Sequence, residues 1–258
     1  MIASLPRPVL VLLLPVGLLC VWQASGQLLG GVRTPLPSRV AVEAFGLVSS
    51  GALPSAMIQS IGRVFTGFLL ALVIAIPLGL LMGTIRGVER NLDPLVESFR
   101  PVAAIALLPM AILWFGTGTP AAVMLVAYAA FFPILINTIS GAKQVDQRLV
   151  LVASTMGLRK STILRTVIVP GAMPQIAVGL RIGLGVAWTA IVAAELAVGA
   201  KSGGGGSGGI GQMMFVFYAY SIELNRIVVC MIGVGLVSLA LDWLLRTAST
   251  RAMPWRTQ

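Results

Sequence analysis

The sequence predicts an all-α, polytopic membrane protein with about six transmembrane helices. Hydrophobic residues make up 57% of its 258 residues and charged residues 10%, whereas a soluble domain carries about 25% charged residues. The uncharged residues also form long intervals: 25 residues between Arg7 and Arg33, 22 between Arg63 and Arg86, and 42 between Arg100 and Lys143. A spanning helix needs about 20 mostly apolar residues, so these intervals hold one, one and two spans.

The expected spans follow from the apolar runs and the breaks between them. Their approximate ranges are 8–27, 60–84, 96–115, 121–140, 174–199 and 225–246. We expect the first to be an uncleaved span, because the apolar run continues past any plausible signal-peptide cleavage site. The turn between the third and fourth is predicted at GTGTP, residues 116–120, where two glycines precede a proline. Prolines inside the spans are compatible with membrane helices whose neighbours satisfy the freed carbonyls.

The cations predict the orientation of these spans. With the N-terminus inside, twelve lie on the cytoplasmic side: Arg7, Arg86, Arg90, Arg100, Lys143, Arg148, Arg159, Lys160, Arg165, Arg246, Arg251 and Arg256. Four lie outside: Arg33, Arg39, Lys201 and Arg226. Because cytoplasmic loops of membrane proteins are enriched in Lys and Arg, we expect both termini in the cytoplasm.

Several function classes are disfavoured by the same composition. The net charge of +10 comes from scattered single cations, without the basic stripe of a nucleic-acid-binding protein. The chain contains no histidine, no Ser/His/Asp set and no phosphate-binding G-x-x-x-x-G-K-[ST] motif. Cys20 and Cys230 each lie in an apolar run and are interpreted as packing residues. We therefore expect no catalytic residues, no metal site and no cofactor bound by this chain.

Residues 152–170 have the sequence VASTMGLRKSTILRTVIVP. This stretch resembles the cytoplasmic signature loop of ABC importer permeases. The family pattern runs Glu-Ala-Ala, a glycine a few residues later, and a proline about a dozen positions after that. Ala153 matches the second alanine, Gly157 the glycine and Pro170 the proline, whereas Leu151 and Val152 stand at the glutamate and first alanine. Because Leu151 replaces the glutamate, a salt bridge from this position is not expected. The glycine–proline spacing of the family pattern is kept.

Other stretches are similar to the nitrate, sulfonate, taurine and bicarbonate branch of these permeases. They are DPLVESFRPVAAIALLPMAILWFGTG, GLRIGLGVAWTAIVAAEL and the tail MPWR, and the taurine and alkanesulfonate members look closest. The resemblance implies a type I ABC importer permease fold in the bacterial inner membrane. It also implies a homodimer with two ATPase subunits, which would bind ATP and Mg, and an extracytoplasmic substrate-binding protein.

The resemblance divides the chain and implies a small anion as substrate. Residues 1–54 would form the first span and an extracytoplasmic segment, 55–250 the permease core with a coupling loop at about 146–172, and 251–258 a cytoplasmic tail. Taurine, another sulfonate, nitrate and bicarbonate are the candidate substrates. A secondary transporter or channel remains the alternative class, although such proteins ordinarily show inverted repeats and broken helices.

In the coupling loop, the residue types predict a rigid docking element. Gly157 can adopt φ > 0 and end a first short helix without steric cost. Leu158 would then supply an apolar contact to the ATPase, while Arg159 and Lys160 meet an acidic or polar rim. Pro170 and Pro174 are expected to break the helix between the loop and the fifth span. An ordinary basic cytoplasmic loop is the alternative interpretation.

Candidate pathway residues lie mainly on the fifth span. Arg181, Trp188 and Glu195 are spaced by seven and share one helix face, with Thr189 beside it. Charges within a span are functional candidates, although Arg181 could instead snorkel to the interface. Asn137 on the fourth span is a further candidate, and interhelical hydrogen bonding explains it equally well.

Three further segments have simpler interpretations. Asp242 and Arg246, four residues apart, are interpreted as an ion pair at the end of the last span. Residues 33–55 are predicted to form an outward amphipathic piece bounded by prolines. The stretch GGGGSGG at 203–209 has the composition of a flexible linker, and its extracytoplasmic position argues against a phosphate-binding loop.

Overall fold

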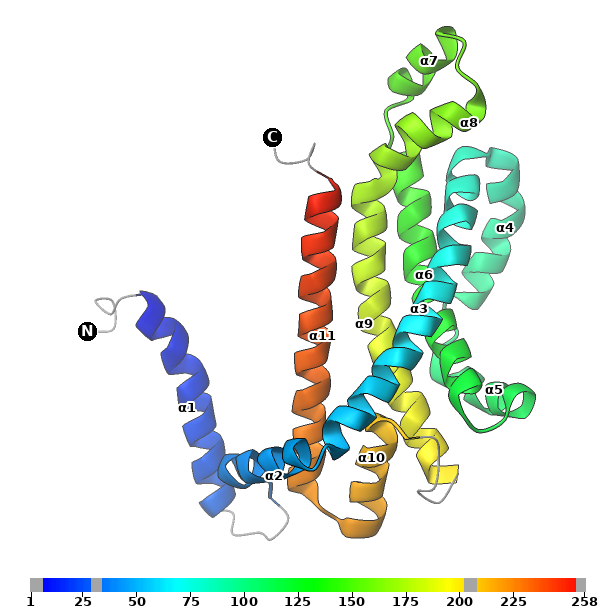
Figure 1. Ribbon diagram of the computed structural model, residues 1–258. Coiled ribbons are helices and arrows are strands. Elements are labelled where there is room, and N and C mark those ends of the chain that lie inside the picture. Colours follow the sequence, from blue (N-terminus) through cyan, green and yellow to red (C-terminus); the bar gives the residue numbers. More distant parts are fainter. Residues whose placement is uncertain (1–6, 29–33, 202–207, 254–258) are drawn as a thin grey trace.

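The computed structural model describes residues 7–28, 34–201 and 208–253, and these residues are almost entirely helical (Figure 1). The helices are α1 (Arg7–Leu28), α2 (Pro37–Ser49), α3 (Ala52–Thr84), α4 (Arg86–Phe99), η1 (Ala104–Leu107), α5 (Leu108–Phe115), α6 (Thr119–Lys143), α7 (Gln147–Thr155), α8 (Lys160–Ile163), η2 (Leu164–Ile168), α9 (Val169–Lys201), α10 (Ile210–Val216), η3 (Phe217–Ser221) and α11 (Leu224–Ala252). The predicted all-α fold class is confirmed, and no strand occurs in the described ranges.

Among the described residues, four helical segments are long and apolar enough to cross a membrane: Ala52–Thr84, Thr119–Lys143, Lys160–Val198 and Leu224–Arg251. They match the second, fourth, fifth and sixth predicted spans, and α1 covers the first. The turn predicted at residues 116–120 is also confirmed, since α5 ends at Phe115 and α6 begins at Thr119.

The third predicted span, 96–115, is wrong as a single helix. Its place is taken by α4 and by η1 with α5, which are bent by 83° at the intervening residues. Pro101 accounts for the break because it has no N–H to donate to the preceding turn, and its ring collides with the helical backbone before it. Arg100 therefore lies at a break within the bundle, directly after the end of α4.

The prediction that Pro170 and Pro174 break the helix before the fifth span is also wrong. The helix continues from α8 through the π-turn η2 into α9, which contains both prolines. Val169 donates its N–H to the carbonyl of Leu164, five residues earlier. This wider turn ends directly before Pro170 and accommodates a residue that cannot donate, as π-bulges do in other helices.

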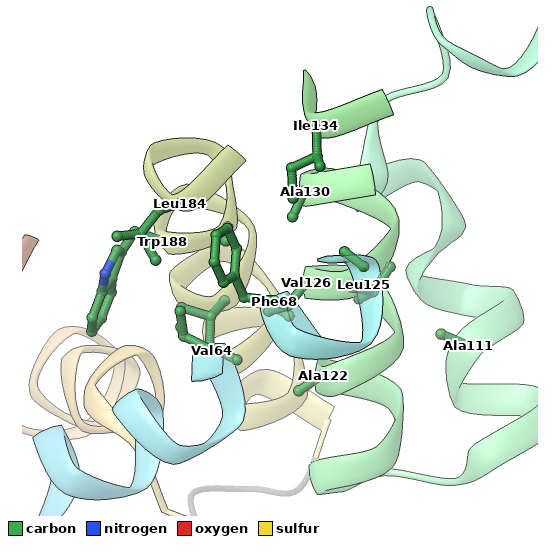
Figure 2. Close-up of a cluster of buried hydrophobic side chains, with 14 of the residues drawn as sticks. Val64, Phe68, Ala111, Ala122, Leu125, Val126, Ala130, Ile134, Leu184 and Trp188 are labelled. Carbon is green, nitrogen blue, oxygen red and sulfur yellow. The ribbon is translucent and has the colours of Figure 1, made fainter. Parts of the chain in front are cut away.

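The core of the bundle is helix α6, packed between α3 and α9 (Figure 2). Small residues let these backbones approach closely, as in other membrane bundles. A Cβ at Gly67 on α3 would lie 2.7 Å from the carbonyl oxygen of Val123, and one at Gly179 on α9 would lie 2.7 Å from Cβ of Asn137. Helix α1 stands apart from this core and packs against α2 (Figure 1).

The two ends of the bundle are different. Helices α7 and α8 project beyond one end, where the C-terminal end of α11 also lies, whereas α2 and α10 lie at the other end (Figure 1). Helix α2 occupies Pro37–Ser49, within the segment 33–55, and Pro37 stands at its start. Of the predicted linker at 203–209, residues 203–207 lie outside the described residues.

Candidate functional site

A helical hairpin, α7 and α8 with the turn between them (residues 147–163), is the first candidate site. Asp146 caps α7, and its side chain accepts a hydrogen bond from the Arg148 N–H at 2.9 Å. Gly157 has φ +76° and ends the helix, as predicted. Its N–H donates to the Ser154 carbonyl at 3.0 Å, while the Leu158 N–H donates to that of Ala153 at 3.3 Å. This pair of bonds is a Schellman motif, which fixes the angle of the turn.

The hairpin exposes apolar side chains at the projecting end of the molecule. Leu149, Leu151, Val152, Met156 and Leu158 are between 41% and 74% exposed. Arg159 precedes α8 and Lys160 begins it, and both are exposed. Ala153 faces inward and is buried. Exposed apolar groups bordered by charges mark interaction surfaces, so the hairpin has the surface of a docking element.

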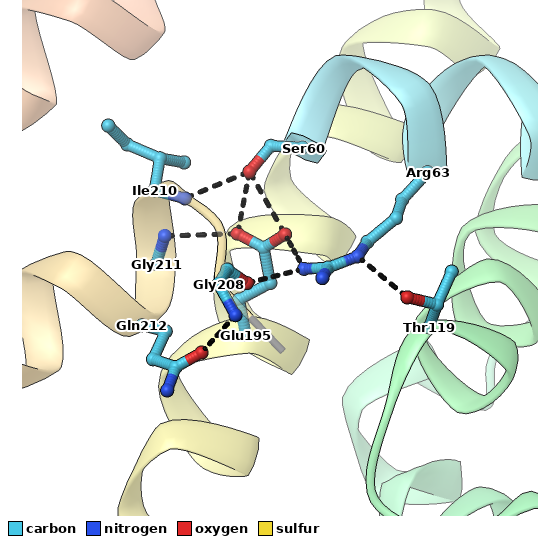
Figure 3. A network of polar contacts seen from close by, with 8 residues as sticks. All are labelled: Ser60, Arg63, Thr119, Glu195, Gly208, Ile210, Gly211 and Gln212. Carbon is cyan, nitrogen blue, oxygen red and sulfur yellow. Dashed lines mark hydrogen bonds and ion pairs between the residues drawn. The ribbon is translucent and has the colours of Figure 1, made fainter. Parts of the chain in front are cut away.

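A buried polar cluster lies at the opposite end of the bundle (Figure 3). Glu195 on α9 is 3% exposed and forms an ion pair with Arg63 on α3, with 2.6 Å between Nη1 and Oε1. The Ser60 hydroxyl lies 2.9 and 2.8 Å from the two carboxylate oxygens and donates to them. The Gly211 N–H donates to Oε2 at 3.0 Å. We call this cluster the Glu195 network.

The Glu195 network connects four elements. Arg63 also donates to the Gly208 carbonyl at 2.7 Å and to the Thr119 hydroxyl at 3.3 Å, while Ser60 accepts from the Ile210 N–H at 2.9 Å. Gln212 accepts from the Gly208 N–H at 2.8 Å. A Cβ at Gly209 would lie 2.3 Å from Oε1 of Glu195, so only glycine allows the backbone to approach the carboxylate. The network thereby fixes the start of α10 against α3 and α9.

Sequence reasoning named Glu195 but not its partners. Arg63 and Glu195 are both single charges in apolar helices, and intramembrane charges usually pair with one another. That rule would have paired them. The roles of Ser60, Gln212 and the backbone of residues 208–211 depend on a loop geometry that residue spacing does not give.

The other candidate pathway residues of the fifth span lie outside the Glu195 network. Trp188 is 2% exposed and packs in the core (Figure 2), whereas the Thr189 hydroxyl donates to the Val186 carbonyl at 2.8 Å. Arg181 forms a two-pronged ion pair with Asp242 on α11, with distances of 2.9 and 3.0 Å. The predicted pairing of Asp242 with Arg246 is therefore wrong, because a guanidinium from the neighbouring helix meets the carboxylate in fork geometry.

The pairing of Arg181 with Asp242 can be tested by exchanging the two charges. We expect Asp242→Arg alone to lower the thermal unfolding midpoint, because two cations then face each other between α9 and α11. The exchange variant Arg181→Asp/Asp242→Arg should recover most of that loss in the same membrane mimetic. The Arg246→Asp variant is the control for the sequence-based pairing. If Arg246→Asp rescues Asp242→Arg and the exchange does not, the assigned pair is incorrect.

Asn137 lines a cavity of about 440 Å³ between α6, α9 and the break that follows α4. Its amide nitrogen donates to the Pro133 carbonyl at 2.8 Å. No other candidate pathway residue lines this cavity. Within the described residues, no three His, Cys, Asp or Glu side chains come together as a possible metal site.

A multi-pass helical bundle with an exposed hairpin at one end and a buried charge pair at the other is the architecture expected of a membrane transport subunit. The chain belongs to the family of binding-protein-dependent transport system inner membrane components, whose model matches residues 75–252. It is thus an inner-membrane permease subunit of an ABC importer, and members of this class work with ATPase subunits and substrate-binding proteins.

Relatives of known name support the same assignment. A putative ABC transporter permease protein of Methanocaldococcus jannaschii is 41% identical over 212 residues, which is 82% of this chain and 76% of the relative. The taurine transport system permease protein of Escherichia coli is 34% identical over 248 residues, 92% of this chain and 86% of the relative. The nitrate import permease protein of a Synechocystis species is 35% identical and covers 87% of this chain and 82% of the relative.

Solved structures confirm the fold class. The chain is similar to an inward-facing form of the MetNI methionine ABC transporter, with a TM-score of 0.62 and 20% identity. That match covers 80% of this chain and 96% of the other. At this identity the similarity shows the fold alone.

Proposed function

We propose that this chain is the transmembrane subunit of an ATP-driven importer for a small anion, coupled to its ATPase through the α7–α8 hairpin. The chain would move substrate by alternating access, and hydrolysis would take place in the partner. The observation that supports this most strongly is the hairpin itself. It exposes five apolar side chains beside Arg159 and Lys160 at the projecting end of the bundle.

The hairpin has the mechanical properties that coupling requires. The Schellman motif at Gly157 fixes the angle between α7 and α8, and α8 continues through η2 into α9 without a break. Displacement of the hairpin by a closing ATPase would therefore move α9 directly. Because α9 packs against α6 and carries Glu195, such a motion reaches both the core and the outer end of the bundle.

The substrate class is inferred from the relatives. Their names include taurine, aliphatic sulfonate, nitrate and bicarbonate transport. All four substrates are small and carry an anionic group whose charge is delocalised over several oxygens, although taurine also carries an ammonium group. We propose the same class here, delivered by an extracytoplasmic binding protein at the end of the bundle that holds α2 and α10.

The assembly would be a homodimer of this chain with two ATPase subunits, and both termini would lie in the cytoplasm. Two copies, each with one hairpin, match two nucleotide sites by symmetry. The C-terminal end of α11 and the hairpin lie at the same end of the bundle (Figure 1), which supports a cytoplasmic C-terminus.

ATP hydrolysis tests the proposed substrate class. The chain, co-expressed with the ATPase and binding protein encoded beside it, is placed in lipid nanodiscs and exposed to taurine, alkanesulfonates, nitrate and bicarbonate. We expect one binding-protein–ligand pair to raise hydrolysis several-fold above the ligand-free rate. Stimulation by a cation or a neutral amino acid, with none by any anion, would contradict the substrate class.

A further inference from the structure

The break between α4 and η1 lies inside the membrane-spanning bundle. The Tyr128 hydroxyl on α6 donates to the Phe99 carbonyl at 2.7 Å and holds the end of α4 against α6. Tyr128 is nine residues from the start of α6 at Thr119 and fifteen from its end at Lys143. At about 1.5 Å per residue, Phe99 and Arg100 lie ~14 Å from one end of α6 and ~22 Å from the other.

This break forms one wall of the 440 Å³ cavity. The cavity is lined by residues of the break, of α6 and of α9, which include Arg100, Ala104, Tyr128, Asn137, Ile182 and Val186. Its volume lies within the roughly 300–1,000 Å³ of small-molecule sites. Arg100 is the only charged side chain of the lining, and Asn137 supplies an amide.

Three arginines on the membrane-spanning helices α3, α9 and α11 pair with carboxylates, whereas Arg100 has no such partner among the described residues. Arg63 pairs with Glu195, Arg181 with Asp242, and Arg226 with Glu43 and Glu223. Over the ranges that the structure describes, the Arg100 side chain has no hydrogen bond or ion pair, and it is exposed in the single chain. A cation at this depth is costly unless it faces a water-filled cavity or an anion.

We propose that this cavity is the intramembrane site for the transported anion and that Arg100 is its counter-charge. The inference rests on the proposed import of a small anion and names the residue that would recognise it inside the membrane. A guanidinium presents parallel N–H donors that match the paired oxygens of a sulfonate, nitrate or bicarbonate. One Asn137 N–H is bonded to Pro133, and the second remains to donate to the same anion. Both ends of α6 lie more than one helical turn from this position, and we assign a permeating anion as the ligand.

Removal of the Arg100 charge should strongly reduce uptake while leaving assembly intact. In the complete transporter we expect Arg100→Gln to lower anion uptake about tenfold or more. The Arg100→Lys variant keeps the positive charge but loses the parallel N–H donors of the guanidinium. Its uptake should lie between that of Arg100→Gln and that of the unmodified chain. The matched control is Arg90→Gln, which removes the same charge ten residues earlier on α4, outside the cavity lining. Basal ATP hydrolysis and uptake should both stay unchanged in Arg90→Gln, and unaltered uptake by Arg100→Gln would overturn the proposal.

A second measurement needs neither an ATPase nor a known substrate. Ala104→Cys places a thiol in the cavity lining, in a Cys20→Ser background because Cys20 is the exposed native thiol of the described residues. We measure how fast this thiol reacts with two methanethiosulfonate reagents in membranes that contain the chain. One reagent carries an anionic ethylsulfonate group and the other a cationic trimethylammonium group. Each rate is divided by the rate for a free thiol.

We expect the anionic reagent to be favoured, and Arg100→Gln to reduce that preference on the order of tenfold, whereas Arg90→Gln leaves it unchanged. An absent or unaltered preference would refute the role of Arg100 even if the chain imports an anion. A preference that depends on Arg100 would support the cavity as an anion site even if no ATPase couples to the chain.

Discussion

Coupled uptake should fall to background in the Gly157→Pro variant, with the protein still inserted in the membrane. Gly157 has φ +76°, whereas proline is fixed near −65°. Proline also removes the N–H that bonds the Ser154 carbonyl at 3.0 Å. The Schellman turn cannot form, and the angle between α7 and α8 is lost. Uptake and substrate-stimulated ATP hydrolysis in the same vesicles measure the effect.

Graded substitutions at Gly157 distinguish turn geometry from general damage. Asparagine tolerates the left-handed conformation better than alanine does, so we expect uptake to decrease in the order Gly157→Asn, Gly157→Ala, Gly157→Pro. A charge reversal tests the proposed contact between Arg159 and the ATPase. Arg159→Glu should also abolish uptake. The control Arg251→Glu, at the same end of the bundle but on α11, should not. Normal uptake by both Gly157→Pro and Arg159→Glu would refute the coupling role of the hairpin.

Loss of one charge from the Glu195 network should strongly destabilise the chain. Breaking a buried ion pair from one side leaves an uncompensated charge and typically costs about 3–5 kcal/mol. In the Glu195→Gln variant, Arg63 loses its partner at 2.6 Å, and Ser60 and Gly211 lose a charged acceptor. We expect a large fall in the thermal unfolding midpoint of the purified chain.

A double-mutant cycle separates this pair from its surroundings. Because both charges are removed together, the Arg63→Met/Glu195→Leu variant should be less destabilised than the sum of the two single variants. The Arg181→Met/Asp242→Leu cycle is the matched comparison, since that pair is 43% exposed on each side, and its coupling should be smaller. Strictly additive effects of Arg63→Met and Glu195→Leu would show that the pair does not act as a unit.

Most of the fold could be predicted because apolar runs and the glycines and prolines of turns are local features of the sequence. The ranges of five spans and the turn at residues 116–120 depend on such patterns and agree with the structure. The bend after α4 could not be recognised in the same way. Pro101 marks a possible break, but Pro133 on α6 and Pro174 on α9 leave their helices continuous. Whether a proline kinks, breaks or is absorbed by a π-turn depends on the neighbours that satisfy the freed carbonyls.

The sites were predictable to different degrees. The positive φ at Gly157 follows from its residue type and spacing, because only glycine adopts this conformation freely. The partners of Glu195 and Arg181 come from α3 and α11, which are 132 and 61 residues away. Heptad spacing on α9 alone cannot find such contacts. The break beside Arg100 is also missed by charge counting, because that method treats each apolar interval as one straight span.

Retention of the ATPase by the purified permease tests the central claim most directly. A tagged copy of this chain is co-expressed with the ATPase encoded beside it, and the ATPase that co-purifies is quantified for the unmodified chain and for Gly157→Pro. We expect one ATPase per permease with the unmodified chain and near-complete loss with Gly157→Pro, at equal amounts of membrane-inserted permease. If no ATPase assembles with the unmodified chain, or if Gly157→Pro retains it fully, the coupling account is contradicted and a secondary transporter becomes the better description.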